Sequence, residues 1–357
     1  CLTLTLLFEF KRLAVKIAFF ACNRNSKLFR ADPSYIYRCE NLGLELIRQG
    51  HQVSFCHIND SLSLTKFDFV VFHRPRNLWR VHFLVSLFRL RGTKVWADFD
   101  DLIFDTSFAE FSPGVVNQIN TLEKTRKTYQ AHAKALSLFD GFTVSTAPLK
   151  DHLLYLRLNK PIAVLPNAPH FSWEHELAHY KRKEIDFSAP VLTYLPGTRS
   201  HDQDFKLVAT SLAAFLRLNK HVSLEITGPL SFQLAEDVSM QVRHYEKVEF
   251  SKFHKRFQAT WVNLAPLEDT PFNQSKSALK VLEAGFWGKP TVCTPSSDAV
   301  RYKEAGAIFL EHPEEIVNIL NGLLNPNYYE SRVKNLRKRV LEVSSIQDNA
   351  LHFIDLV

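Results

Sequence analysis

The chain has 357 residues, more than one hydrophobic core usually organises, so we expect two domains. Its 46% hydrophobic and 23% charged residues are typical of a globular protein, and no apolar run approaches the ~18 residues of a membrane-spanning helix. Forty-four basic residues against 37 acidic ones give a net charge of +7, which favours anionic partners: nucleotide phosphates, nucleic acid or an acidic membrane face.

The five cysteines are widely spaced and form no CxxC pair, which indicates neither a disulfide framework nor a zinc site. A reducing cytosol is therefore the simplest compartment. The opening segment, CLTLTLLFEFKRL, is too short to span a membrane and has no small-residue cleavage site, so we do not expect a signal peptide. Residues 1–13 are interpreted either as an artefact of the gene start or as a weak interfacial anchor.

Strands and helices alternate in the first half of the chain. Continuous apolar runs predict buried strands at residues 16–23, 51–58, 67–74, 94–104, 141–146 and 162–167. Asp32 or Ser34 begins a helix that Gly50 ends, and a long helix is predicted near residues 115–138. This alternation indicates a parallel α/β sheet.

A polar, charged segment at residues 168–189 is interpreted as a linker, after which the alternation restarts. Further strands are predicted at residues 189–197, 221–230, 247–250, 261–267 and 290–295. The sequence therefore predicts two doubly wound α/β domains that face each other across a cleft, at residues 14–168 and 189–330. We expect a C-terminal helix at residues 331–357 to pack back toward the N-terminal domain. In such sheets, ligands bind beyond the carboxyl ends of the strands.

The stretch NQSKSALKVLEAGFWGKP, at residues 273–290, predicts a helix that follows such a strand end. At roughly 100° per residue, Lys276, Lys280 and Glu283 share about 60° of its circumference. A separate apolar face is formed by Leu279, Leu282 and Phe286. Two cations and an acid beside a helix N-terminus suit a nucleotide diphosphate, with the lysines on the phosphates and the carboxylate on the ribose hydroxyls. The alternative is an ordinary amphipathic helix with solvated charges.

The pattern Asn273-x-x-Lys276-Ser277-x-x-Lys280-x-x-Glu283, with Gly288-x-Pro290 beyond it, resembles the donor-site helix of family 4-type (group 1) glycosyltransferases. Other segments are similar, in order, to motifs of the bacterial polysaccharide members: SYIYRCENLGLELIRQGHQV, FDFVVFHRPRN, KVWADFDDLIFD, FTVSTAPL, VLPN and YLPGTRSHDQDF. The resemblance covers most of the chain and implies the GT-B architecture of two Rossmann-like domains. It also implies sugar transfer from a nucleotide-diphosphate sugar to a glycan acceptor in capsule or lipopolysaccharide synthesis, with retention and without a metal or other cofactor.

Two positions depart from the family pattern. Many members carry two glutamates separated by seven residues on this helix, but Ser275 stands where the first is expected. Glu268 or Asp269 is a candidate substitute, and the departure leaves the sugar contact and the retaining course open. Gly197 permits a close backbone approach and Arg199 is a candidate diphosphate clamp, although a turn with a solvated arginine is the alternative. The lysine that typically follows this arginine is replaced by Asp204.

The motif D-F-D-D at residues 98–101, at the end of a predicted strand, is interpreted as the acceptor side of the cleft, with Asp100 and Asp101 as candidate bases. A D-x-D pair is also the metal–nucleotide signature of the other common glycosyltransferase architecture. That architecture would explain neither the restart of the α/β pattern nor the Lys-Lys-Glu helix, so we expect no metal. One of Asp98 and Asp100 is open to a structural role, paired with Arg74 or Arg76.

Histidines give weaker signals. His73, at the end of its predicted strand, is a further catalytic candidate, although a lone histidine is more often structural. His201 is weaker still, and the other histidines have no metal-ligand spacing. No GxSxG, Walker or GxGxxG motif is present, which argues against serine hydrolases, P-loop enzymes and dinucleotide dehydrogenases. The basic stretches carry no nucleic-acid-binding motif.

The expected partners are therefore a nucleotide-sugar donor and a glycan or lipid-linked glycan acceptor. Because lipid-linked acceptors are usual for the family, we expect a cytoplasmic protein in peripheral contact with the membrane, through residues 1–13 or the helix around RVHFLVSLFRLRG; a buried core helix is the alternative for the latter. Two other functions stay open: a nucleotide-sugar epimerase on the same architecture, and a catalytically silent glycan- or nucleotide-binding domain.

Overall fold

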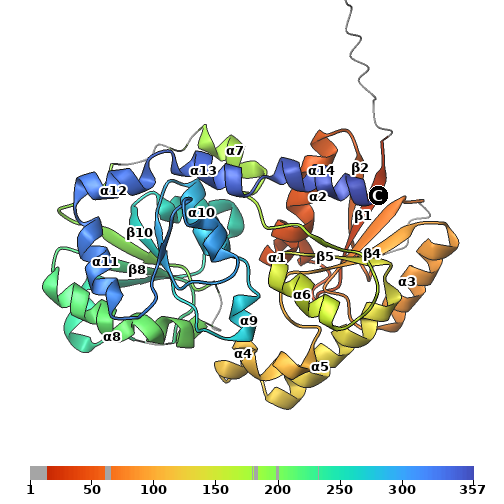
Figure 1. The fold of residues 1–357 in the computed structure, drawn as a ribbon, viewed down its shortest axis with the longest axis horizontal. Helices are drawn as coiled ribbons and strands as arrows, with labels where there is room; N and C mark the ends of the chain where they lie inside the picture. The colour runs from red at the N-terminus through yellow and green to blue at the C-terminus, as the bar shows by residue number, and fades with distance from the viewer. Residues whose placement is uncertain (1–13, 61–65, 179, 181–183, 198–200, 232) are drawn as a thin grey trace, which may run out of the picture.

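The computed structural model describes residues 14–357 apart from 61–65, 179, 181–183, 198–200 and 232. Within these residues the chain forms two six-stranded parallel sheets flanked by helices, one in each half of the sequence (Figure 1). The predicted α/β class of two doubly wound domains is confirmed.

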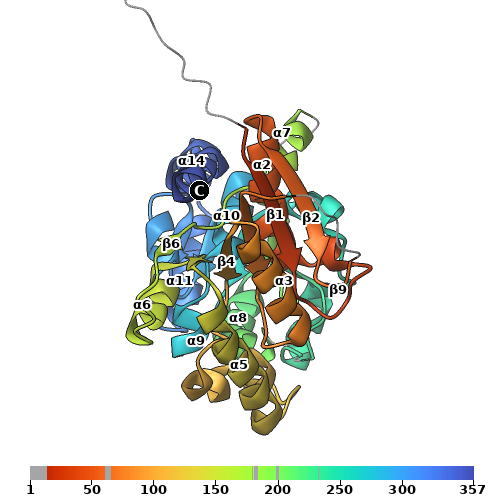
Figure 2. The same cartoon turned by 90° about the vertical axis from the view of Figure 1, so that its right-hand side faces the viewer.

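The first sheet has the strand order β2-β1-β3-β4-β5-β6. Its strands are β1 (Lys16–Ala21), β2 (Gln52–His57), β3 (Phe69–His73), β4 (Lys94–Phe99), β5 (Gly141–Val144) and β6 (Ile162–Val164). Alternate residues of β1 face opposite sides: Ile17 packs with the helix α2 (Asn41–Arg48), and Ala18 packs with α3 (Trp79–Leu90). Figure 2 looks onto this domain, with α2 and α3 beside β1.

The second sheet has the order β12-β11-β10-β7-β8-β9. Its strands are β7 (Val191–Tyr194), β8 (Ser223–Thr227), β9 (Val242–Tyr245), β10 (Thr260–Ala265), β11 (Thr291–Cys293) and β12 (Ala307–Phe309). The longest helix of the described residues, α8 (Asp202–Leu218), buries Phe205, Leu212 and Leu216 in the core of this domain. The other helices of this half are α7 (Ser172–Leu177), α9 (Pro271–Gln274), α10 (Leu279–Phe286), α11 (Glu315–Leu323), α12 (Pro326–Val333) and α13 (Leu336–Val343).

The first helical segment runs from Pro33 to Arg48 as α1 (Pro33–Tyr35), a π-helical turn (Ile36–Glu40) and α2. Asp32 caps it, because its side chain accepts a hydrogen bond from the Ser34 backbone N–H at 3.0 Å. Gly50, with φ +93°, follows its end as predicted. Single π turns of this kind occur frequently at functional sites.

Two predicted elements were wrong. The long helix near 115–138 is two helices, α4 (Pro113–Val116) and α5 (Leu122–Ala135), because Gln118 has a positive φ of 56° and the Thr121 side chain caps α5. The strand at 247–250 is absent; β9 pairs with β8 instead, and Phe250 packs its ring on Trp173 and Tyr37.

The segment at 168–189 is more than a linker. It contains α7, whose Trp173 is 2% exposed and packs against Phe286 and Trp287 in the core of the C-terminal half. The strand β12 was not predicted, because three residues carry too short a period to detect.

The end of the chain returns to the first domain. The helix α14 (Ile346–Leu356) packs on α2, and its Ala350 and Phe353 belong to the same buried cluster as Phe19 of β1 (Figure 1). The Asn349 side-chain amide donates to the Pro166 carbonyl at 2.6 Å. This contact ties the C-terminal helix to the crossing segment between the two sheets.

Two helices of the first domain bear on the membrane prediction. The helix α3 buries Val81, Leu84, Val85 and Phe88 but leaves Trp79 73% and Leu90 86% exposed. The other, α6 (Ala147–Tyr155), exposes Leu154 and Tyr155. No helix in the described part of the chain is long and apolar enough to cross a membrane. Residues 1–13, the other predicted contact, lie outside the described residues.

Candidate active site between the two domains

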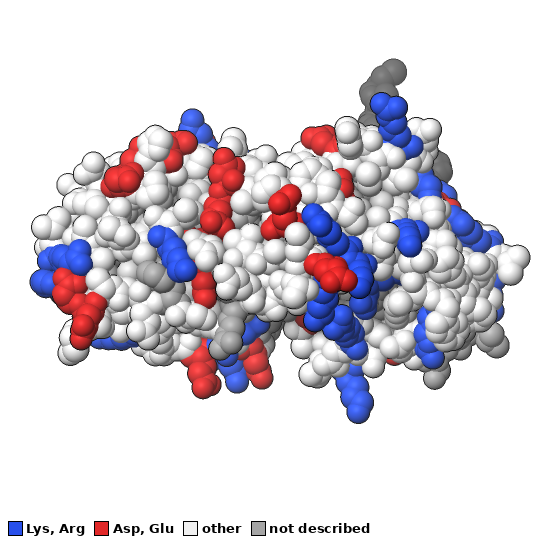
Figure 3. Space-filling view, turned by 90° about the horizontal axis from the view of Figure 1, so that it is seen from below, with Lys and Arg blue, Asp and Glu red and all other residues white. Residues whose placement is uncertain are grey.

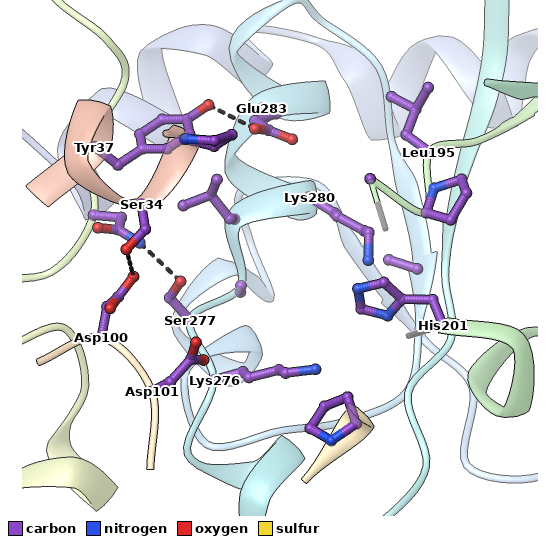
Figure 4. Close-up of a pocket in the computed structure, with 18 of the residues that line it drawn as sticks. Ser34, Tyr37, Asp100, Asp101, Leu195, His201, Lys276, Ser277, Lys280 and Glu283 are labelled. Carbon is purple, nitrogen blue, oxygen red and sulfur yellow. Dashed lines mark hydrogen bonds between the residues drawn. The ribbon is translucent and has the colours of Figure 1, made fainter. Parts of the chain in front are cut away.

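A cavity of about 960 Å³ lies between the two domains and is lined by both (Figure 4). The N-terminal domain contributes the start of its first helical segment, with Ser34 and Tyr37, and the turn after β4, with Asp100 and Asp101. The C-terminal domain contributes the ends of β7 and β10 and the start of α10. The cavity thus lies where the carboxyl ends of the two parallel sheets face each other, as expected for such sheets.

The predicted donor helix is shorter than expected. Residues 271–274 form α9 and 279–286 form α10, so Lys280 and Glu283 lie on a helix one turn apart, but Lys276 lies in the connecting turn. The break has a physical cause: the Ala278 N–H donates to Asp298 at 2.8 Å, and Ala278 has a non-helical ψ of 46°. The prediction that the three share a helix face was therefore wrong.

Lys276, Lys280 and Glu283 nevertheless all line the cavity. Leu282 and Phe286 are buried as predicted, whereas Leu279 is half-buried and faces the cavity. The turn at Lys276 changes the backbone direction and still leaves the two lysines at one wall of the cavity (Figure 4).

Burial alters the charges at this wall. Burial and the neighbouring Lys276 lower the pKa of Lys280 to about 8, and burial also lowers the pKa of Lys276. Burial raises the pKa of Glu283 to about 7, although the hydrogen bond from Tyr37 and the charge of Lys280 oppose this shift. A bound anion would stabilise both lysines in their charged form, because burial has removed the water that otherwise solvates them.

Asp204, which stands where the family has a lysine, holds the loop beneath the cavity. It accepts hydrogen bonds from the Glu268 N–H at 2.9 Å and the Asn273 side chain at 3.3 Å, and contacts His201 Nδ1 at 2.7 Å. His201 lines the cavity, and its pKa is lowered to about 3 by burial and by Lys280. His201 is therefore neutral near pH 7.

The candidate substitutes for the missing first glutamate are placed elsewhere. Neither Glu268 nor Asp269 is among the described residues that line the cavity. Ser275 is buried; its hydroxyl donates to the Pro271 carbonyl, and its own carbonyl accepts from Thr146 Oγ1 of the other domain at 2.8 Å. Position 275 thus serves as a contact between the domains.

Gly197 lies in the cavity wall just after β7, with a φ of 74° that disfavours any residue with a Cβ. Arg199, the predicted diphosphate clamp, lies outside the described residues. Its role stays a prediction.

On the opposite wall, Arg74 joins the two predicted bases. Its guanidinium donates to Asp100 Oδ1 and to Asp101 Oδ2, each at 2.5 Å. Burial would raise the pKa of Asp100, but Arg74 and His73 outweigh it and the pKa is lowered. Burial raises the pKa of Asp101, which Arg74 only partly opposes. The pKa of Asp101 is therefore higher than that of the neighbouring Asp100.

Asp98 points away from the cavity into the protein. It pairs with Arg38 through two hydrogen bonds of 2.7 and 3.2 Å and accepts from Thr143 Oγ1 at 2.7 Å, while His73 Nδ1 lies 2.9 Å from it. The predicted pairing of one of these two aspartates with Arg74 is therefore confirmed for Asp100, whereas Asp98 pairs with Arg38. The described residues contain no group of three or more His, Cys, Asp and Glu side chains that could hold a metal.

His73 is 3% exposed and does not itself line the cavity; its Nε2 contacts Ser34 Oγ at 2.8 Å. Three residues with contacts at this site were missed by sequence reasoning: Ser34, Tyr37 and Arg38. All three belong to the segment SYIYR, a motif to which the sequence alone assigns no chemistry.

No protein-family model matches the chain, and neither does any curated protein sequence. Solved structures do match. Sucrose-phosphate synthase from Thermosynechococcus elongatus aligns over 96% of this chain and 98% of its own, with a TM-score of 0.60 and 14% identity. An α,α-trehalose-phosphate synthase (UDP-forming) from Burkholderia xenovorans aligns over 82% of this chain and 74% of its own, with a TM-score of 0.54 and 13% identity. TarM from S. aureus, in complex with UDP, aligns over 81% of this chain and 55% of its own, with a TM-score of 0.52 and 11% identity. The likeness shows the fold: two Rossmann-like domains in the GT-B arrangement.

Proposed function

We propose that the protein transfers a sugar from a nucleotide-diphosphate sugar to a glycan acceptor. The observation that carries this proposal is the pairing of two cavity walls, one with Lys276, Lys280 and Glu283 and the other with Asp100 and Asp101. The basic wall suits the diphosphate and ribose of a donor. The acidic wall suits the hydroxyl groups of an acceptor.

The structural neighbours support the donor class. The trehalose-phosphate synthase is described as UDP-forming, and a further neighbour, from E. coli, is described as bound to UDP-2-fluoro glucose. The TarM structure contains UDP together with two saccharide ligands, Fondaparinux and α-GlcNAc-glycerol. The ligands of these neighbouring proteins favour a nucleotide sugar over a dinucleotide as the ligand of this fold.

In the proposed reaction, the bond between the anomeric carbon and the diphosphate oxygen breaks as the sugar acquires oxocarbenium character. Negative charge grows on the leaving diphosphate, where Lys280 and Lys276 stabilise it in a site of low dielectric. Gly197 allows the backbone to approach the phosphates, and Arg199 is the proposed third cation. No metal is needed for this charge balance, since the protein supplies the cations itself.

The stereochemical course depends on which group takes the acceptor proton. The resemblance to retaining enzymes implies that the leaving phosphate takes it. An inverting course needs a side-chain base, for which Asp100, Asp101 and His73 are the candidates. The anomeric configuration of the product, measured by NMR, distinguishes the two.

The proposed setting is bacterial surface polysaccharide synthesis at the cytoplasmic face of the membrane. The apolar side chains exposed on α3 and the exposed basic residues of α5, Lys124, Arg126, Lys127 and Lys134, suit an anionic surface. Figure 3 views the molecule from below, with basic side chains gathered on the half that contains α5.

A panel of nucleotide sugars (UDP-glucose, UDP-N-acetylglucosamine, UDP-galactose and GDP-mannose), with the free nucleoside diphosphates, tests the proposal by thermal shift. A ligand at 100 times its dissociation constant adds about 2.7 kcal/mol of stability. Release of nucleoside diphosphate from the ligand that binds is then measured. Binding without turnover would leave a silent binding module, and conversion of the sugar without any acceptor would favour an epimerase.

A further inference from the structure

His201 is held at two points in the wall of the cavity. It stands immediately before α8 and lines the cavity (Figure 4). Its backbone carbonyl accepts a hydrogen bond of 3.3 Å from the hydroxyl of the buried Tyr194, and its ring Nδ1 lies 2.7 Å from Asp204 Oδ2. The side chain makes no capping hydrogen bond to α8. The ring is therefore fixed in place without being needed to cap the helix.

Asp204 decides which ring nitrogen carries the proton. Burial would raise the pKa of Asp204, but the hydrogen bond with His201 and the charge of Lys276 outweigh it and the pKa is lowered. Its Oδ1 accepts from the Glu268 N–H and the Asn273 side chain, which leaves Oδ2 for the imidazole. Because an ionised carboxylate only accepts hydrogen bonds, His201 Nδ1 donates to it, and Nε2 of the neutral ring is then an acceptor.

The ring of His201 lies beside the two lysines of the donor wall. In Figure 4 the side chains of Lys280 and Lys276 extend toward the side of the cavity on which His201 lies. Burial and the charges of both lysines lower the pKa of His201 to about 3, although Asp204 opposes this shift. An anion bound at the lysines would cancel their effect and attract a proton to the ring. A phosphate oxygen and an unprotonated Nε2 would repel each other, since both are acceptors.

We propose that His201 is a ligand of the donor diphosphate, which binds the imidazolium form of its ring, and that Asp204 is the residue that positions this ring. The inference rests on the proposed function and adds a residue to its donor site. A proton from solvent joins Nε2 as the nucleotide sugar binds, so that Nδ1–H donates to Asp204 and Nε2–H donates to a phosphate oxygen. When the bond between the anomeric carbon and the diphosphate breaks, its electron pair stays on the diphosphate. The imidazolium keeps its proton and stabilises this charge.

A protonated His201 also compensates an acid that lies beside a site for an anion. Asp204 is 3% exposed, and its negative charge would otherwise oppose a diphosphate at the neighbouring lysines. The charged and titratable groups around the pair come from several elements: Asp204 itself on α8, Lys280 on α10, Lys276 in the turn before α10, Glu268 after β10 and Tyr194 on β7.

The alternative is a His201 that stays neutral and accepts a hydrogen bond from a hydroxyl of the ribose or the transferred sugar. The position of the ring beside Lys280 and Lys276 favours the diphosphate, because two neighbouring cations attract an anion more strongly than a hydroxyl. The two roles differ in the protonation state of the bound protein, which can be measured.

NMR of the full chain with 15N-labelled histidine reports the protonation state of His201 directly. The spectrum of His201→Gln identifies its resonances among those of the 15 histidines. Without ligand, His201 should be neutral at about pH 5.5; with a saturating nucleotide sugar from the panel, both of its ring nitrogens should carry protons at that pH. A His201 that is neutral in the complex would overturn the proposal. His201→Asn serves for the assignment where His201→Gln does not melt cooperatively.

Calorimetry of nucleotide-sugar binding at about pH 6, in buffers of different ionisation enthalpy, counts the protons taken up. Lys280 keeps its proton at this pH, because its pKa is about 8. Glu283, with a pKa of about 7, would release a proton if the ribose favours its ionised form, so the wild type is compared with His201→Gln. The wild type should take up more protons than the variant, by up to one per chain. Equal uptake by the two proteins would contradict the proposal.

His201→Gln should lower the affinity for the nucleotide sugar by about 10- to 100-fold at about pH 6, as expected for a charge-assisted hydrogen bond, and by less at about pH 7.5. It should lower kcat further, because the charge on the diphosphate grows as the sugar departs. Asp204→Asn keeps an acceptor oxygen but removes the charge that stabilises the imidazolium, so it should shift the pH dependence to lower pH. His221→Gln, which alters an exposed histidine of the same domain, is the matched control.

The outcomes separate this role from the proposed function. If Lys280→Ala loses affinity while His201→Gln keeps the affinity of the wild type at both pH values, His201 is not a ligand and the transferase proposal stands. A wild type that neither binds nor turns over any nucleotide sugar would overturn both.

Discussion

The hydroxyl of Tyr37 donates a hydrogen bond of 2.5 Å to Oε1 of Glu283, and the two residues belong to different domains. Tyr37 is 6% exposed, and its ring packs edge-on against Trp173 and Phe250 of the C-terminal half. The carboxylate that we propose for the ribose is therefore also a contact that holds the two domains together.

Tyr37→Phe should destabilise the protein by about 1–3 kcal/mol, because it leaves a buried carboxylate without a donor. The loss should grow as the pH rises through about 7, where Glu283 becomes ionised and its bond to Tyr37 becomes charge-assisted. Urea denaturation at pH 5.5 and pH 8 measures it.

Tyr35→Phe is the matched control for this change. The buried hydroxyl of Tyr35 donates to the Phe19 carbonyl at 2.8 Å, within one domain, and that acceptor does not titrate. Its loss should be equal at the two pH values. If the loss in Tyr37→Phe is also the same at both pH values, ionisation of Glu283 does not strengthen its hydrogen bond with Tyr37.

Glu283 should also give the wild type a pH-dependent stability. Its pKa is about 7 in the folded protein against 4.5 in the unfolded chain, so between these values the folded state binds a proton that the unfolded state has released. Stability should therefore fall as the pH rises from about 4.5 to about 7, by about 3 kcal/mol in total. Glu283→Gln should remove this dependence.

Melting curves of the ligand-free wild type and Glu283→Gln, recorded at pH 5 and pH 8, check this expectation. The melting temperature of the variant should increase relative to that of the wild type as the pH increases, because the buried amide of Gln does not ionise. In the same variant, affinity for nucleoside diphosphate should decrease, because the amide is a weaker acceptor for ribose hydroxyls. Parallel pH profiles of the two proteins would show that Glu283 is not the titrating group.

Much of the fold follows from local sequence patterns. The apolar runs predicted β1, β3, β4 and β10 because strands covered on both faces are nearly continuous in hydrophobicity. The positions of Lys280 and Glu283 on one helix were predicted from a spacing of three residues, which one helical turn fixes.

The remaining features depend on contacts between distant residues. Asp298 binds the backbone of Ala278 and ends the helix that would have carried Lys276. Asp98 finds its partner in Arg38, sixty positions away, in place of the nearby arginines. Local periodicity contains neither interaction, because each is decided by which segments the sheet brings together.

Asp98→Asn distinguishes a structural carboxylate from a metal ligand. Both carboxylate oxygens of Asp98 contact other side chains, those of Arg38, Thr143 and His73. The substitution should therefore destabilise the protein by about 3–5 kcal/mol, because it leaves the guanidinium of Arg38 buried and without a compensating charge. Thermal melting measures this loss. Treatment of the wild type with EDTA should leave donor binding and turnover unchanged. Activity that EDTA abolished and manganese restored would move the donor site to Asp98 and Asp100.

Membrane contact is tested by vesicle sedimentation. Replacement of Trp79 and Phe83 by Ser removes two of the apolar side chains that α3 exposes, 73% and 50% respectively, without touching its buried face. Binding to vesicles with anionic lipid should decrease, and binding to neutral vesicles should be weaker from the start. Equal binding of the wild type to both vesicle types would exclude an electrostatic contribution.

Lys280 provides the most direct test of the donor site, because its charge depends on pH in the range of the assay. The pKa of Lys280 is lowered to about 8 by burial and by Lys276, and a bound diphosphate should raise it by supplying the opposite charge. Affinity for nucleoside diphosphate should therefore fall as the pH rises from 7 to 9.5, with proton uptake on binding above pH 8. Calorimetry in buffers of different ionisation enthalpy measures that uptake.

Lys280→Ala should abolish the pH dependence and lower kcat by about 10²–10³-fold, more than it lowers affinity, because the charge it meets grows as the leaving group departs. Lys303→Ala, an exposed lysine of the same domain, should change neither. Leu282→Ala, on the same helix but in the core of the C-terminal domain and 1% exposed, should instead cost about 2–5 kcal/mol of stability. If Lys280→Ala keeps the affinity, pH profile and turnover of the wild type, the start of α10 does not hold the diphosphate and the proposed function loses its main support.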